Sequence, residues 1–146
     1  MKKILFLFCI SSILWSACNK DNNSDPVATY FKCKIDGASF EQEVLEFPAD
    51  NLTEGSLDLK FTSGDRSLTL GVIEFYGQTG TYDANWVHYD NGSTDFYGDM
   101  GTVIITEINL DREFISGTFT GTCSPPAGGT NVQITEGEFV MQYFDL

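Results

Sequence analysis

The sequence has little basic charge. Lys and Arg together number 8 against 21 Asp and Glu, which gives a formal net charge of −13. Nucleic acids and anionic lipid headgroups bind to basic surfaces, because their phosphates must be neutralised by Lys and Arg side chains. Eight scattered cations do not provide such a surface, and we therefore expect no nucleic-acid partner.

Motifs for catalysis are also lacking. His88 is the only histidine, so the chain has neither a two-histidine zinc site nor an HExxH motif. It contains no G-x-S-x-G elbow and no phosphate-binding loop. Cys123 and His88 could form a nucleophile and base pair, but a buried or oxidised cysteine is a poor nucleophile. Paired carboxylates occur by chance in so acidic a chain. We therefore predict a non-enzymatic protein without a cofactor.

The sequence has no apolar run of the about 20 residues that a membrane-spanning helix needs. Its longest run, residues 4–14, follows Lys2 and Lys3 and precedes Ser16-Ala17-Cys18. A basic start, a short apolar run and small residues before a cysteine are typical of an export signal that ends at a lipid-attachment site. We predict a signal peptide over 1–17 and acylation of Cys18, which would attach the protein to a membrane.

An ordinary cleaved signal peptide is the alternative to lipidation. The large aliphatic residue of a lipobox usually stands three positions before the cysteine. In this chain Trp15 occupies that position, and Leu14 stands one residue earlier. If Cys18 is acylated, residues 18–27 are the lipidated cysteine and a flexible tether. The segment after Cys18 is polar and has little apolar surface to bury. The roughly 120 residues that remain, 28–146, suffice for one domain.

Four cysteines are present, and two of them belong to the predicted leader region. Cys9 would leave with the signal peptide and Cys18 would carry the lipid, so Cys33 and Cys123 remain. An even pair in an oxidising compartment is a disulfide candidate. Two buried, reduced cysteines that act as small apolar side chains are the alternative.

The pattern of apolar residues predicts an all-β domain. No stretch shows the periodicity of an amphipathic helix, whereas apolar residues alternate at period two between turns rich in Gly, Asn and Asp. About nine antiparallel strands are expected, and they would close into a sandwich or a flattened, lipocalin-like barrel. Their expected ranges are 30–35, 39–43, 57–61, 68–75, 85–90, 93–98, 103–110, 113–123 and 132–144.

Local signals refine three parts of this prediction. Asp36-Gly37 is typical of a type I′ turn, which would place Cys33 opposite Phe40. The inward phase of the strand after residue 68 shifts to Ile73 and Phe75, which indicates a bulge or a strand that changes layer. Gly137 indicates a second bulge within the last strand.

The Asn91-Gly92 dipeptide predicts a second hairpin with a two-residue turn. Such a turn would place His88 opposite Asp95 and Trp86 opposite Tyr97. Alternation then assigns Val87, Tyr89 and Phe96 to the core. The two opposing pairs just named, His88 with Asp95 and Trp86 with Tyr97, would lie on the outer face. Aromatic rings beside polar groups suit sugars and other polar ring ligands, so Trp86, His88, Asp95 and Tyr97 are the ligand-binding candidates. An aromatic pair with an exposed ion pair is the alternative.

The same turn gives a weak calcium candidate. Asp90 and Asp95 flank a short segment rich in oxygen ligands, which calcium prefers. The spacing is not that of an EF-hand loop, and a solvated hairpin turn explains Asn91-Gly92 without a metal. We therefore predict no metal site beyond this weak candidate.

Several segments resemble one family of small Bacteroidota lipoproteins whose all-β domain has no assigned function. The similarity covers nearly the whole domain and rests on YFKCKIDG at 30–37, GTY at 80–82, ISGTF at 115–119 and ITEGEF at 134–139. The polar tract NKDNN after Cys18 is similar to those associated in that group with export to the cell surface. The resemblance implies an outer-membrane lipoprotein that faces the cell surface, and it assigns no site residue.

Two functions follow from these observations. The first is a surface-anchored binding module for a small molecule, a glycan or a protein partner. The second is a structural accessory of an outer-membrane protein complex that has no small-molecule ligand.

Overall fold

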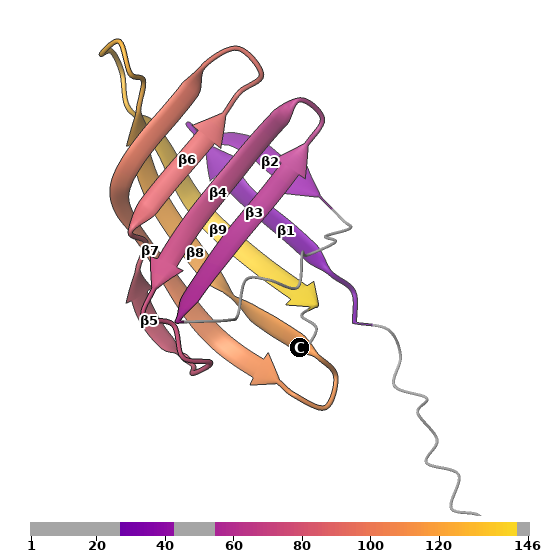
Figure 1. Ribbon diagram of the computed structural model, residues 1–146. Coiled ribbons are helices and arrows are strands. Elements are labelled where there is room, and N and C mark those ends of the chain that lie inside the picture. The colour runs from indigo at the N-terminus through magenta and orange to yellow at the C-terminus, as the bar shows by residue number, and fades with distance from the viewer. Residues whose placement is uncertain (1–26, 43–54, 143–146) are drawn as a thin grey trace, which may run out of the picture.

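A computed structural model describes residues 27–42 and 55–142. The described chain forms nine antiparallel strands, which confirms the all-β prediction (Figure 1). Within these residues no helix is long and apolar enough to cross a membrane. The strands are β1 (Tyr30–Ile35), β2 (Ala38–Gln42), β3 (Ser56–Ser63), β4 (Arg66–Ile73), β5 (Gly80–Asp83), β6 (Trp86–Asp90), β7 (Asp95–Asn109), β8 (Phe114–Ser124) and β9 (Val132–Gln142).

All nine strands belong to one sheet that curves into a nearly closed barrel. The order is β2-β1-β9-β8-β7-β6-β4-β3, and β5 pairs separately with β7. Figure 1 shows β3, β4 and β6 on one side of the barrel and β1, β8 and β9 on the other. Two hydrogen bonds join the edge strands β2 and β3: Thr62 N donates to Gln42 Oε1 (3.2 Å), and Ser63 Oγ donates to the Glu41 carbonyl (3.3 Å). The fold is therefore a barrel and not a two-sheet sandwich.

Aromatic rings fill the interior of the barrel. Phe61 on β3 stacks against Phe31 on β1, with ring centroids 4.0 Å apart, and against Phe119 on β8, with centroids 5.5 Å apart. This stack connects opposite walls of the barrel. The period-two alternation expected for strands is present in β3 and β4, whose apolar residues Leu57, Leu59, Phe61, Leu68, Leu70 and Val72 are all buried.

Two local predictions are confirmed. Asp36 and Gly37 have φ values of 49° and 82°, as a type I′ turn requires, and Cys33 pairs with Phe40. On β9, residues 136 and 137 together lie opposite Cys33, because Lys32 pairs with Glu138 and Lys34 pairs with Thr135. Two residues facing one define a bulge, which lies where Gly137 predicted it.

Three details of the strand prediction are wrong. Residues 95–109 form one long strand, β7, in place of two short ones, and the Gly80 segment pairs with it as β5. The inward phase does not shift at Ile73, which is exposed. The strand ends there, and Glu74 takes a positive φ of 61°, after which Phe75 is buried in the core. The predicted signal peptide and Cys18 lie outside the described residues.

Candidate functional site

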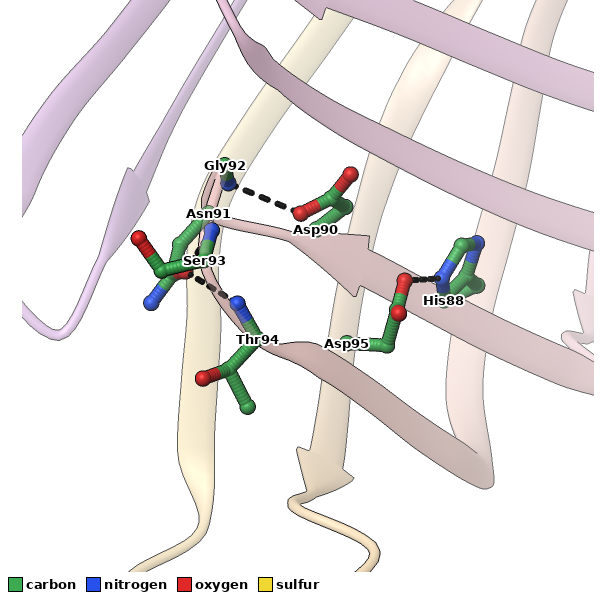
Figure 2. A network of polar contacts seen from close by, with 7 residues as sticks. All are labelled: His88, Asp90, Asn91, Gly92, Ser93, Thr94 and Asp95. Atoms are coloured by element: carbon green, nitrogen blue, oxygen red, sulfur yellow. Dashed lines mark hydrogen bonds and ion pairs between the residues drawn. The ribbon is translucent and has the colours of Figure 1, made fainter.

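The connection between β6 and β7 is wider than the predicted two-residue turn. Asp90 pairs with Asp95, so residues 91–94 form a four-residue loop (Figure 2). The Asn91 side-chain oxygen accepts hydrogen bonds from the backbone N–H groups of Ser93 (3.0 Å) and Thr94 (2.9 Å). Asp90 Oδ1 accepts one from Gly92 N (2.7 Å). These side-chain oxygens satisfy the backbone N–H groups of the loop and favour the four-residue loop over the two-residue turn.

The wider loop shifts the register by two residues, so the predicted opposing pairs are wrong but both faces are preserved. Val87 and Tyr89 are buried, and Phe96 packs against the core. His88 now lies opposite Tyr97, and the two rings stack with centroids 4.7 Å apart at 10°. His88 Nε2 donates a diagonal hydrogen bond of 2.8 Å to Asp95 Oδ1. Three of the four predicted ligand-binding residues are therefore neighbours.

Trp86 does not join this cluster. It lies opposite Gly71 on β4, and a Cβ atom at Gly71 would stand only 1.8 Å from Cε2 of the indole. The indole thus covers the backbone of β4, on the side of β6 that faces away from Tyr97. With 38% of its surface exposed, Trp86 flanks the site but does not pair with Tyr97 as predicted.

Cys33 and Cys123 are free, buried thiols in the structure, which corresponds to the second of the two alternatives considered for them. Cys33 lies on β1 and Cys123 on β8, and β9 runs between these strands. Strands lie about 4.8 Å apart, so two thiols separated by a strand lie beyond the reach of a disulfide. Burial raises the pKa of Cys33 to about 12 and that of Cys123 to about 11. Neither thiol is a nucleophile at neutral pH.

A groove lies on the outer face of the barrel, over β7, β8 and β9, and its volume is about 760 Å³. One side is formed by the connection between β5 and β6. The paired glycines Gly101 and Gly121 lie in its floor, and Val87 packs beneath them from the core side. Its lining comprises Asp83, Ala84, Asn85, Met100, Gly101, Thr102, Thr120, Gly121, Thr122, Gln133, Ile134 and Thr135.

The chemistry of this groove is neutral and polar. Four threonine hydroxyls and two side-chain amides line it, and Asp83 is the only charged residue among the lining residues that the structure describes. Thr122 donates a hydrogen bond to Gln133 Oε1 (3.1 Å). Within the described parts of the chain, the hydroxyls of Thr102, Thr120 and Thr135 make no hydrogen bond to protein, so they remain available to a ligand. Met100, which is 63% exposed, adds an apolar wall.

A second hollow, on the outer face of β2, β1 and β9, has a volume of about 180 Å³ and a charged lining. Four of its five charged residues are paired across strands: Lys32 with Glu138 (2.9 Å) and Lys34 with Glu136 (2.8 Å). The bond and charge of Glu138 raise the pKa of Lys32, which keeps that amine protonated. These exposed pairs tie β1 to the bulged part of β9, and a ligand would have to break them. The larger groove is the better candidate site.

The calcium candidate finds no support in the geometry. Asp90 already binds the loop backbone and Asp95 already binds His88. In the described ranges, no group of three or more His, Cys, Asp or Glu side chains could hold a metal ion.

The groove residues were not among the candidates that the sequence suggested. Their signal is the alternation of Thr118, Thr120 and Thr122 along the outer phase of β8. A hydroxyl row on one strand is common, however, and the groove requires Thr102 and Thr135 from strands whose register only the folded sheet sets.

The fold and the groove define a small β-barrel protein with an open, polar groove on its outer wall, in which Asp83 is the one charged residue among the described lining residues. The chain belongs to a family described as Domain of unknown function (DUF6252), whose model matches residues 28–141. No curated protein and no solved structure shows significant similarity to it.

Proposed function

We propose that the protein is a non-enzymatic binding module that captures an uncharged polar ligand in the groove over β7, β8 and β9. A lipid on Cys18 would anchor the module at the cell surface or in the envelope. The observation that carries the proposal is the contrast between the groove and the rest of the chain. A protein with a net charge of −13 presents, in this groove, hydroxyls and amides with a single carboxylate among the described lining residues.

The lining narrows the class of ligand. Among the described residues no cation lines the groove, so an anionic ligand would find no counter-charge there. One carboxylate offers little to a divalent cation, which takes several oxygen ligands. Hydroxyls and amides both donate and accept hydrogen bonds, and this suits ligands that are rich in hydroxyls. A glycan or a small polyol fits this description best.

The groove can be tested with paired substitutions that keep side-chain shape. Thr102→Val and Thr120→Val together remove two hydroxyls and leave two buried ligand groups unpaired, which should weaken binding by about 2 kcal/mol or roughly thirtyfold. Neutral glycans would be screened against the full chain purified in detergent, and the affinity of any that bind would be measured by calorimetry.

Thr62→Val is the matched control, because Thr62 is exposed on β3 and its backbone N–H, not its side chain, contacts Gln42. Equal affinity in all variants would place the ligand elsewhere. Failure of every neutral glycan and polyol to bind would overturn the binding module and favour the structural accessory.

The lipid anchor has its own test. Intact-mass measurement on protein extracted from membranes should show a chain that begins at Cys18 and carries acyl groups. Cys18→Ala should leave the protein unacylated and shift it to the soluble fraction. A free N-terminus at another residue in the wild-type protein would contradict the anchor.

A further inference from the structure

Tyr97 lies on β7, three residues before Met100, the first residue of that strand that lines the groove. It is 55% exposed on the outer face of β7 and pairs with Ser124 on β8. The next pair along these two strands, Met100 with Thr122, already belongs to the groove lining. An irregularity in the β7–β8 pairing separates Tyr97 from Met100, so the aromatic ring stands beside the hydroxyl-lined hollow on the same outer face but is not part of its lining.

The orientation of the ring follows from its neighbours. His88 lies across the strand pair on β6, and its ring is nearly parallel to that of Tyr97. Side chains stand roughly perpendicular to a sheet, so two stacked rings on adjacent strands have their faces turned along the direction that crosses the strands. One face of Tyr97 is therefore covered by His88, and the other is turned toward β8, above Ser124.

His88 is itself held in place. Its Nε2 atom donates to Asp95 Oδ1 at 2.8 Å, so the imidazole that supports Tyr97 has a fixed tilt (Figure 2). A flat ring with one face supported and the other open needs little ordering when a ligand stacks on it, which reduces the entropic cost of binding.

We propose that Tyr97 is the stacking platform of a second subsite and that the ligand is a linear, uncharged glycan of at least two pyranose rings. This inference rests on the binding groove proposed above. One ring packs its C–H face on Tyr97 above Ser124, and the following ring or rings bind to the threonine hydroxyls. Ser124 and Thr120 are separated by about 14 Å along β8, at roughly 3.4 Å per residue, which is too far for one ring to reach both.

The experiment measures the affinity of neutral oligosaccharides of one to four units, taken from a series that binds the full chain. Four proteins are compared: wild type, Tyr97→Ala, Tyr97→Phe and Thr102→Val/Thr120→Val. With wild type, affinity should rise at least tenfold from one unit to three. Tyr97→Ala should abolish most of this gain, with about tenfold weaker binding of the trimer, while the single unit is little affected. Tyr97→Phe, which retains the ring, should behave as wild type.

Thr102→Val/Thr120→Val separates the two proposals, because it should weaken binding of every length. If this variant loses affinity while Tyr97→Ala does not, the groove stands and the stacking subsite is overturned. A wild-type affinity that is the same for one unit and four also overturns the subsite. If no glycan of any length binds, the proposed function itself fails.

Discussion

Replacement of Phe61 by Ala should destabilise the barrel by about 3–5 kcal/mol, which is the usual range for removal of a buried aromatic side chain. Phe61 is fully buried, and its ring contacts those of Phe31 and Phe119. Its loss would leave a cavity between the rings of Phe31 and Phe119 in the interior of the barrel. Urea unfolding followed by circular dichroism measures the change.

Two variants serve as controls for this prediction. Phe61→Leu keeps most of the volume and should cost less than half as much. Tyr76→Ala removes an aromatic ring that is 74% exposed and should change the free energy of unfolding by less than about 0.5 kcal/mol. A similar loss in Phe61→Ala and Tyr76→Ala would show that the central stack does not hold the walls together.

Stability should fall steeply as the pH rises above about 9. Thiols in an unfolded chain lose their protons near pH 9, whereas burial keeps the pKa of Cys33 at about 12 and that of Cys123 at about 11. Between these limits the unfolded state binds fewer protons than the folded state, so the free energy of unfolding decreases with pH. Each thiol contributes a slope that approaches about 1.4 kcal/mol per pH unit only well between its unfolded and folded pKa values, so the two thiols together give a loss of roughly 4 kcal/mol between pH 9 and pH 11.

Urea titrations at pH 8, 9, 10 and 11 in the presence of a reductant test this dependence. Tyrosine and lysine side chains also titrate in this range, so the informative quantity is the difference from a Cys33→Ala/Cys123→Ala variant. That variant should be less stable at pH 8 but should show a shallower decline. If the free energy of unfolding of both proteins falls with pH in parallel, the buried thiols are not the cause of the decline.

The parts of the fold that the sequence predicted are those governed by local rules. The Asp36-Gly37 turn fixed its own register, because both residues accept positive φ, and the alternation around Leu57 and Leu68 placed both rows in the core. The Asn91-Gly92 turn misled for a local reason as well. Asn91 accepts hydrogen bonds from Ser93 and Thr94, so the same dipeptide also suits a four-residue loop.

The candidate site was harder to predict because it depends on long-range register. His88, Asp95 and Tyr97 were found because alternation alone assigns them to one face, and a register shift of two residues preserves that face. The predicted partner of Trp86 was wrong because its neighbour on β4, Gly71, is distant in sequence. The groove combines Thr102, Thr120 and Thr135 from three strands, and no local signal fixes their proximity.

The narrow junction between β2 and β3 has a mechanical consequence. Every other strand boundary in the barrel wall is a backbone ladder, whereas among the described residues this boundary depends on the Gln42 amide and the Ser63 hydroxyl. Opening the barrel at this seam would break these two hydrogen bonds and the stacking of Phe61 on Phe31, but it would leave every backbone ladder intact. We therefore expect the wall to open at this seam before it opens at any ladder. The groove lies over β7, β8 and β9, in the middle of the strip, and would keep its shape while the circumference of the barrel changes.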